Sequence, residues 1–156
     1  ISITIISKTS NPVLRSGVKK NNLICYTGTL GSCKEDLGKL FKNEVISKKS
    51  KFIKPKLNPY FFYEIAPYIT ASMDISDGLF FELEKLSKSS KIGFEFFNEI
   101  SENIGSSGEE YEILFSFDEK NLEKINKIAQ KHKVELNIFA KAIKGKYRTA
   151  CKNHHF

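Results

Sequence analysis

A segment near the middle of the chain combines residue types that suit metal and phosphate chemistry. It reads Asp74-Ile75-Ser76-Asp77-Gly78 and joins an apolar, strand-like run to a helical one. Carboxylates three residues apart can hold a hard cation such as Mg²⁺, and the free N–H groups at a helix start can bind phosphate oxygens. Residue types such as Ser76 and Asp77 also commonly cap a helix, with a stabilisation of about 1 kcal/mol. The segment by itself therefore leaves two interpretations open, a nucleotide and metal site or a helix cap.

A second segment places three carboxylates in and after a flexible turn. It reads SGEEYE and spans residues 107–112. From this loop, Glu109 and Glu110 can reach a ligand that carries a cationic group. We expect the strand that follows to put Tyr111 on one face and Glu112 on the other. The alternative interpretation is a solvated acidic turn.

The basic residues give a third candidate site and argue against a nucleic-acid partner. Arg15 lies in a polar loop and can act as a phosphate clamp, although an exposed surface arginine is the common alternative. The formal net charge is +7, but only Arg15 and Arg148 among the 25 basic residues are arginine. Residues 61–118 carry 12 acidic and 3 basic groups, so the charge is mixed in sign. Nucleic-acid recognition favours arginine and a basic stripe, and we therefore expect no such partner.

Several other chemistries are excluded by spacing. Cys25, Cys33 and Cys151 form neither a disulfide framework nor a C-x-x-C metal site. His154 and His155 are adjacent and have no H-x-x-x-H partner, which disfavours zinc, and no G-x-S-x-G pattern supports covalent catalysis. No apolar run approaches the roughly 18 residues that cross a bilayer. We expect a protein of the reducing cytoplasm with no membrane partner.

The elements that must position these residues follow from the hydrophobic pattern. Strands are expected at 1–7, 23–28, 71–74, 92–97, 111–117 and 135–142. Helices are expected over 31–45, 59–65, 79–90 and 119–133, with Pro59 at the first helical position of its helix. The 156 residues suit one domain. The order predicts an α+β fold, an α/β sandwich in which helices pack on a mixed sheet.

Four segments, taken in order, resemble thiamine-monophosphate kinase. They are RSGVKKNNLICYTGTLG at 15–31, SMDISDGL at 72–79, SGEEYEILF at 107–115 and HF at 155–156. The resemblance spans essentially the whole chain but only the second half of the family's length. It implies that residues 1–156 are a single C-terminal domain, in which 1–14 are the strand and linker from a missing nucleotide-binding half. It also implies the fold of the C-terminal domain of aminoimidazole ribonucleotide synthetase-like proteins.

The resemblance further implies an activity and assigns roles by matching motif positions. Members of the family transfer the γ-phosphoryl group of ATP to thiamine monophosphate, with Mg²⁺, and form thiamine diphosphate. On this basis Asp74 and Asp77 are metal ligands, while Ser76 and Arg15 bind ATP. Positioning and cations that neutralise the transferring group supply most of the catalysis in such reactions.

The substrate side is implied in the same way. Glu109 meets the thiamine moiety, Asn153 stands where an aromatic residue usually stacks on the substrate, and Phe156 can supply an aromatic group instead. Glu110 stands where the family has aspartate. The resemblance also implies a homodimer through the missing N-terminal half. Two alternatives stay open, another ATP-dependent enzyme of the same superfamily, such as aminoimidazole ribonucleotide synthetase, or a non-catalytic ligand-binding or assembly domain.

Overall fold

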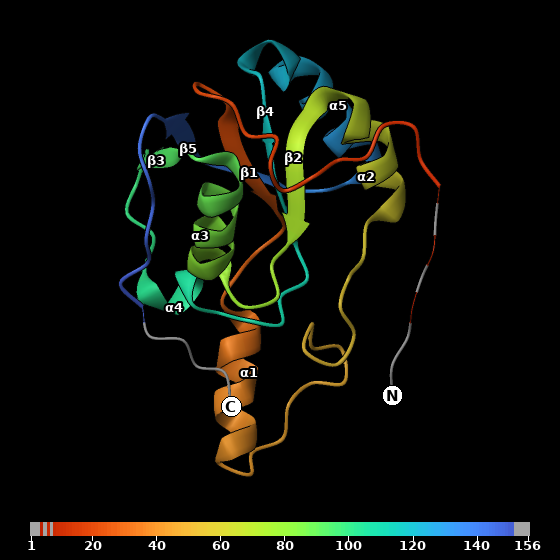
Figure 1. Cartoon of the computed structure of the whole chain (residues 1–156). Coiled ribbons are helices and arrows are strands. Elements are labelled where there is room, and N and C mark those ends of the chain that lie inside the picture. Colours follow the sequence, from red (N-terminus) through yellow and green to blue (C-terminus); the bar gives the residue numbers. More distant parts are fainter. Residues whose placement is uncertain (1–3, 5, 7, 152–156) are drawn as a thin grey trace.

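The computed structural model describes residues 4, 6 and 8–151 (Figure 1). Most of the strand expected at 1–7 and the predicted substrate residues Asn153 and Phe156 lie outside the described residues. The strands are β1 (Leu23–Thr27), β2 (Ile69–Asp74), β3 (Gly93–Phe96), β4 (Ile113–Phe117) and β5 (Leu136–Ile143). The helices are α1 (Ser32–Phe41), α2 (Pro59–Ile65), α3 (Leu79–Ser90), α4 (Glu102–Gly105) and α5 (Leu122–His132), with 3₁₀ turns η1 (Ala66–Tyr68) and η2 (Glu119–Asn121).

The five strands form one sheet in the order β2-β4-β1-β5-β3, and every neighbouring pair is antiparallel. The α+β class predicted from the sequence is confirmed, but the sheet is antiparallel rather than mixed. The unit β2-α3-β3 has the element order of a parallel crossover. In the structure β2 and β3 lie at opposite edges of the sheet, so this crossover joins strands that do not pair.

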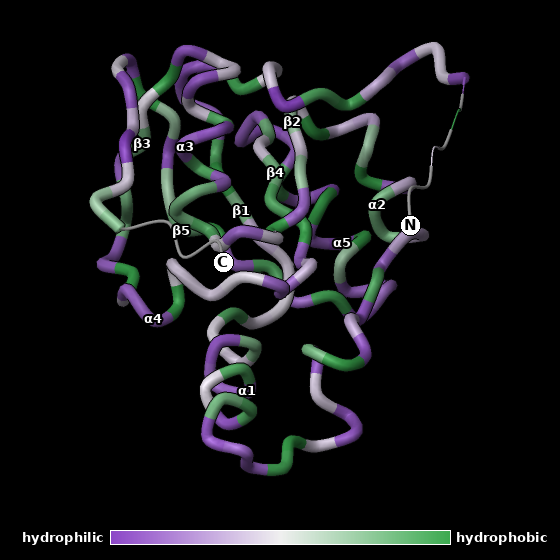
Figure 2. Tube along the Cα trace, turned by 60° about the horizontal axis from the view of Figure 1, so that its bottom comes forward, coloured by the Kyte–Doolittle hydropathy of each residue, from purple (hydrophilic) through white to green (hydrophobic). Residues whose placement is uncertain are grey.

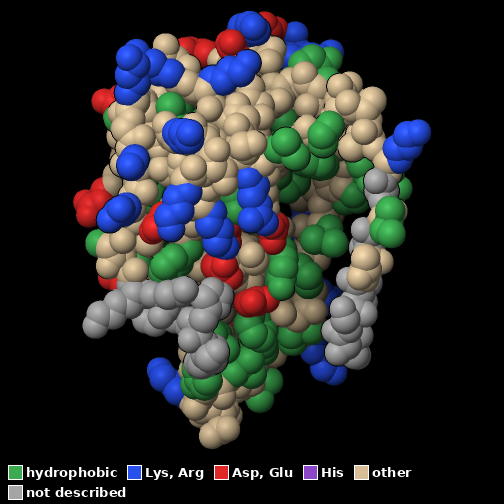
Figure 3. Space-filling model, viewed as in Figure 1, with side chains coloured by type: hydrophobic (Ala, Val, Ile, Leu, Met, Phe, Trp, Pro, Cys, Tyr) green, Lys and Arg blue, Asp and Glu red, His purple; other side chains and the backbone are tan. Residues whose placement is uncertain are grey.

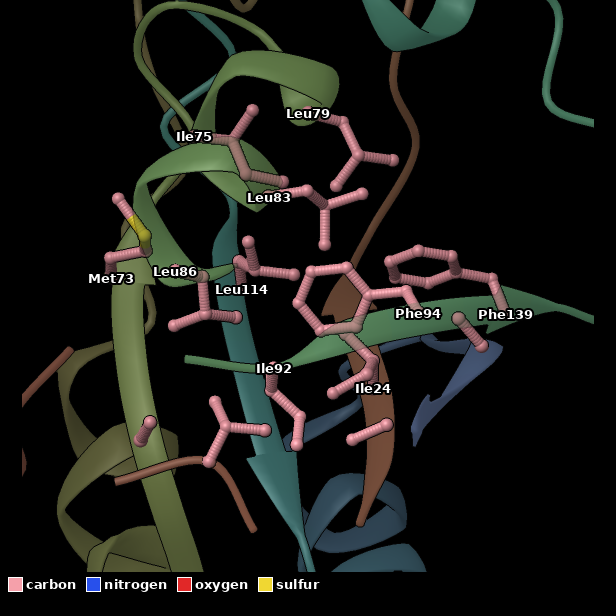
Figure 4. Packing of buried hydrophobic residues seen from close by; sticks show 14 residues of the cluster. Ile24, Met73, Ile75, Leu79, Leu83, Leu86, Ile92, Phe94, Leu114 and Phe139 are labelled. Carbon is pink, nitrogen blue, oxygen red and sulfur yellow. The ribbon is translucent and has the colours of Figure 1, made fainter. Parts of the chain in front are cut away.

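Two apolar clusters lie on the two faces of the sheet. Leucines of α3, namely Leu79, Leu83 and Leu86, pack on one face against Ile24 and Leu114 (Figure 4). The other face is covered by α2 and α5. Its cluster combines strand and helix residues: Leu23, Cys25, Phe61, Ile65, Phe115, Phe117, Ile125, Ile128 and Ala129. The sheet is therefore buried on both sides, which holds its strand ends in fixed positions.

The helix and strand positions largely match the hydrophobic pattern. Pro59 opens α2 at its first turn, as expected from its fixed φ angle. The expected helix at 119–133 begins as η2 and continues as α5. The additional short helix α4 lies in a segment expected to be a loop, because a single helical turn has too little periodicity to be recognised.

An arm made of α1 and residues 42–58 projects from the end of the sheet (Figures 1 and 2). It carries exposed apolar side chains, among them Val45, which is 95% exposed, and Leu57, which is 67% exposed. Within the described part of the chain, no helix has both the length and the apolar character needed to cross a membrane.

Candidate functional site

The predicted site segments meet at one end of the sheet. Asp74, the last residue of β2, is paired with Ile113, the first residue of β4, and Tyr26 near the end of β1 pairs with Leu114. Because these strands are antiparallel, the loops that follow β1 and β2 and the loop that precedes β4 lie side by side. In Figure 3, acidic side chains gather at this level of the molecule, just above the arm.

Backbone hydrogen bonds join the loop after β2 to the loop before β4. The amide of Glu109 donates to the Ser76 carbonyl at 2.8 Å, and the amide of Tyr111 donates to the Ile75 carbonyl at 2.9 Å. The amide of Ile75 donates in return to the Glu112 carbonyl at 2.8 Å. We call residues 74–77 and 108–112 the loop pair. It brings together the two segments that the sequence analysis singled out separately.

Glycine is required where the two loops are closest. A Cβ atom on Gly108 would lie 2.9 Å from the Ser76 carbonyl oxygen, which is closer than real Cβ contacts allow. Gly78 has φ 104°, in a region that residues with a side chain rarely adopt. Both glycines therefore serve the close approach of these loops.

Glu109 and Tyr111 form the exposed tip of the loop before β4. Both have left-handed backbones, with φ 58° and 51°, and the Tyr111 hydroxyl donates to Glu109 Oε2 at 2.6 Å. The hydrogen bond to Glu109, helped by burial and by nearby negative charge, raises the pKa of Tyr111 above its usual value. The expectation that Tyr111 lies on one face of the strand is wrong, because β4 begins only at Ile113.

Glu110 faces the interior and cannot reach a ligand, contrary to the prediction. Its side chain is fully buried, and Oε1 accepts hydrogen bonds from the amides of Gly31 and Cys33 and from the Ser107 hydroxyl, at 2.8, 3.1 and 2.6 Å. These two amides belong to the start of α1, so Glu110 neutralises a helix N-terminus. Its role is to fasten the arm to the loop pair.

Lys51 links the two buried carboxylates of this loop. Its ammonium group lies 2.9 Å from Glu110 Oε2 and 2.8 Å from Glu112 Oε1, and it donates to the Thr29 carbonyl at 2.5 Å. Glu112 Oε2 also accepts from the Thr27 hydroxyl at 2.5 Å. Burial alone would lower the pKa of Lys51, but the hydrogen bonds to Glu112 and Glu110 outweigh it and raise that pKa. The solvated acidic turn is therefore also an incorrect description of this segment.

The start of α3 is held by a residue that sequence reasoning missed. The N-cap position of α3 is occupied by Gly78, so neither Ser76 nor Asp77 is the N-cap residue itself. Instead Glu82 in the first turns of α3 reaches back: its Oε1 accepts from the Asp77 amide at 3.1 Å and from the Ser76 hydroxyl at 3.4 Å. The Lys85 ammonium lies 3.0 Å from the same oxygen and also pairs with Asp77.

The sequence did contain a pattern that indicates a buried, partnered carboxylate at Glu82. It occupies the buried face of α3 together with Leu79, Leu83 and Leu86, at the i, i+3, i+4, i+7 spacing of an apolar stripe. A carboxylate within such a stripe is fully buried only when it is paired or hydrogen-bonded. The helical pattern therefore marks Glu82 as a residue with a polar partner nearby.

Arg15 lies apart from the loop pair, along the edge of β2. Its neighbour Leu14 accepts a hydrogen bond from the Ser72 amide at 3.3 Å, and its own carbonyl accepts from the Ser90 hydroxyl at 3.0 Å. The Arg15 side chain is exposed. The structure thus brings Asp74, Ser76, Asp77 and Glu109 together, while Arg15 flanks them.

The donor set of the loop pair suits magnesium better than zinc. In the described ranges, no three His, Cys, Asp or Glu side chains form a group that could hold a metal ion by themselves. Mg²⁺ commonly takes only one or two protein carboxylates, with water and substrate phosphates as its other ligands. Asp77 already holds a cationic group, the Lys85 ammonium, which shows that this position accepts positive charge.

A cavity of about 520 Å³ lies elsewhere, between β3 and the segment 147–151. Phe80, Phe96, Tyr147 and Arg148 are among its lining residues. Burial raises the pKa of Tyr147 to about 12. None of the predicted site residues in the described part of the chain lines this cavity, so it is a separate surface from the loop pair.

Sequence comparison identifies relatives with one name. No family model matches the chain. The thiamine-monophosphate kinase of Pyrococcus horikoshii is 31% identical over 137 residues, which cover 78% of this chain and 44% of that protein. The thiamine-monophosphate kinase of Buchnera aphidicola subsp. Schizaphis graminum is 29% identical over 157 residues, which cover 86% and 48%. The chain spans about half the length of the curated relatives it matches.

Structural comparison gives the same fold. A crystal structure of thiamine-monophosphate kinase from Stenotrophomonas maltophilia has a TM-score of 0.76 at 15% identity and covers 88% of this chain and 52% of that one. A ThiL structure complexed with AMPPCP and TMP has a TM-score of 0.71 at 19% identity and covers 86% and 49%. The Escherichia coli hydrogenase maturation protein HypE has a TM-score of 0.67 at 11% identity and covers 88% and 48%.

These comparisons bear on two expectations. At such low identities the solved structures show the fold alone, and they confirm the predicted α+β architecture. The sequence relatives confirm the resemblance that the four ordered segments indicated. This chain is a relative of the thiamine-monophosphate kinases and corresponds to about half of such a protein.

Proposed function

We propose that the protein containing this chain transfers the γ-phosphoryl group of ATP to thiamine monophosphate, with Mg²⁺, and that the chain is its C-terminal domain. The observation that carries the proposal is the loop pair. In a relative of thiamine-monophosphate kinases, backbone hydrogen bonds of 2.8–2.9 Å join a turn with two aspartates to the turn that carries Glu109. A structural neighbour crystallised with AMPPCP and TMP supports a nucleotide and this substrate as the ligands.

The nucleotide side of the site rests on the loop after β2. Asp74 and Asp77 hold Mg²⁺, which when bound neutralises negative charge on the phosphoryl group. The Ser76 hydroxyl donates a hydrogen bond to a phosphate oxygen. Arg15 contributes a guanidinium group to the phosphates from the edge of β2. Such groups act by orientation and charge, which is what phosphoryl transfer requires.

The acceptor side rests on the loop before β4. Glu109 is exposed and its amide binds the Ser76 carbonyl, and its carboxylate attracts the cationic ring of thiamine monophosphate. Tyr111 fixes the orientation of this carboxylate through their 2.6 Å hydrogen bond. The acceptor and donor groups are thereby held on two loops that are hydrogen-bonded to each other, which supports the short distance that transfer needs.

The test is an assay of phosphoryl transfer by the complete reading frame that encodes this chain. We expect ATP, thiamine monophosphate and Mg²⁺ to yield thiamine diphosphate and ADP. Asp77→Asn should lower kcat by a factor of about 100 or more, because a metal ligand is lost. The matched control is Asp118→Asn, which removes a carboxylate just beyond the opposite end of β4 and should leave kcat within about twofold.

Three results would redirect the proposal. Turnover by Asp77→Asn close to that of the unsubstituted protein contradicts the assigned metal site. Phosphorylation or ligation of a different acceptor in a substrate panel indicates another enzyme of the superfamily. Binding of ATP and thiamine monophosphate without any product indicates a non-catalytic binding domain.

A further inference from the structure

Lys85 pairs with two carboxylates at the start of α3. Its ammonium group pairs with Asp77 and also lies 3.0 Å from Glu82 Oε1. Glu82 is fully buried, and its second oxygen, Oε2, has no hydrogen-bond partner among the described residues. The Lys85 side chain is 39% exposed and that of Asp77 is 26% exposed. The lysine therefore bridges the buried carboxylate of Glu82 and the accessible carboxylate of Asp77, which belongs to the loop pair.

We propose that Lys85 is a built-in counter-ion that competes with the divalent cation for Asp77. The inference rests on the proposed function in one respect, the assignment of Asp77 as a metal ligand. In the absence of a divalent cation, Lys85 neutralises Asp77 and holds the loop after β2 in place. A divalent cation coordinates Asp77 only after the ammonium group has left it. Lys85 thereby sets the concentration of the cation at which the site fills.

The surroundings of Lys85 allow this exchange. A lysine has a flexible stem, and a partly exposed ion pair is weakly held in water, so that release from Asp77 is easy. Glu82 Oε1 stays hydrogen-bonded to the Asp77 amide, which keeps the loop in position while the ammonium moves. After release, Lys85 keeps Glu82 as its partner, since both residues belong to α3 at i, i+3 spacing. The buried carboxylate is therefore never left without its cation.

Lys88 provides a matched control on the same helix. It pairs with Glu84 at 3.0 Å, and its side chain is 73% exposed. Its substitution removes the same formal charge three residues away without touching Asp77 or Glu82. A general effect of net charge on cation binding would appear equally in Lys85 and Lys88 variants, whereas competition for Asp77 would appear only in Lys85 variants.

The experiment is a titration of the protein encoded by the complete reading frame with Mn²⁺ at low ionic strength, with free Mn²⁺ measured by electron paramagnetic resonance. Lys85→Gln, which can still donate a hydrogen bond to Glu82, should bind Mn²⁺ about threefold to tenfold more tightly than the unsubstituted protein. Lys88→Gln should change the affinity by less than about twofold. Lys85→Arg, which keeps the charge, should show no gain, and Asp77→Asn should abolish the gain when combined with Lys85→Gln. Thermal melting of each variant verifies that it is folded.

The outcomes separate this inference from the proposed function. Unchanged or weaker binding by Lys85→Gln, or an equal gain by Lys88→Gln, overturns the counter-ion role even when Asp77→Asn shows that the metal site is real. A gain that survives Asp77→Asn overturns both the counter-ion role and the metal assignment, whereas no Mn²⁺ binding by any variant overturns the counter-ion role. A gain that depends on Asp77 supports the counter-ion role, even if the complete protein fails to phosphorylate thiamine monophosphate.

Discussion

The two residues at the tip of the loop before β4 are held in an uncommon backbone conformation. Glu109 and Tyr111 have positive φ angles, although neither is glycine. Such residues cost about 1 kcal/mol or more each and persist where the surrounding structure fixes them. Here the backbone bonds to Ser76 and Ile75 fix them. The strain exposes Glu109 and Tyr111 while the residue between them faces inward.

Titration of Tyr111 tests this pairing directly. The hydrogen bond to Glu109, together with burial and the negative charge of Glu109, disfavours the phenolate form and so raises the pKa of Tyr111. Glu109→Gln removes the charge, and we therefore expect Tyr111 to ionise at a lower pH than in the unsubstituted chain. NMR of tyrosine labelled at the ring carbon that bears the hydroxyl measures this. Glu102→Gln, at an exposed position of α4, is the control.

One outcome of this titration would contradict the pairing of Glu109 and Tyr111. If Tyr111 titrates at the same pH with and without the Glu109 carboxylate, the two side chains are not paired in solution. In that case the proposed role of Glu109 in binding a cationic ring loses its structural support.

At the scale of elements, ion pairs and hydrogen bonds attach the arm to the loop pair. Glu110 binds the first amides of α1, and Lys51, from the connector between α1 and α2, lies between Glu110 and Glu112. The connector has no helix or strand of its own between α1 and α2. These ion pairs and hydrogen bonds therefore help to hold the arm against the loop pair.

Removal of Lys51 should show how much this fastening contributes. Lys51→Met leaves two buried carboxylates without their shared cation, and we expect the free energy of unfolding to fall by about 2–4 kcal/mol. Lys49→Met, at an exposed position two residues earlier, should change it by less than about 0.5 kcal/mol. Urea denaturation at neutral pH measures both variants. Equal stabilities of the two variants would show that the connector is not held by this lysine.

The sequence predicted the elements better than their connections. Period-two and helical patterns located the five described strands and the longer helices, because burial on a sheet face or helix stripe repeats regularly. Glu110 was predicted to reach a ligand, and it does not, because the left-handed backbones of Glu109 and Tyr111 set its direction. The partner of Lys51 and the order of the strands depend on contacts between distant segments. Such contacts leave no local pattern in a single sequence.

At the scale of the whole molecule, folding buries two thiols. Cys25 lies in the cluster under α2 and α5, and Cys33 lies at the start of α1 beside Glu110. Burial raises the pKa of both thiols, that of Cys33 to about 11. The pKa of Lys51 is also raised. All three groups thus favour the protonated form in the folded state.

These shifts predict that stability decreases at alkaline pH. A group whose pKa is raised on folding contributes stability that is complete below its unfolded pKa and is lost as the pH rises through its folded pKa. For the thiols this loss of stability begins near pH 9, and for Cys25 it continues beyond pH 11. For Lys51 the loss begins at a higher pH than it does for the thiols. We expect the free energy of unfolding to fall by about 2–4 kcal/mol between pH 8 and pH 10.5.

The double variant Cys25→Ala, Cys33→Ala identifies the source of this alkaline loss. It should be less stable than the unsubstituted chain at pH 8, because a buried side chain is truncated in the core, yet its stability should fall less steeply toward pH 10.5. Urea denaturation in the presence of a reductant, at several pH values, gives the slope for each protein. A double variant that loses stability as steeply as the unsubstituted chain would assign the alkaline loss to lysine and tyrosine groups, and the buried thiols would then have no part in it.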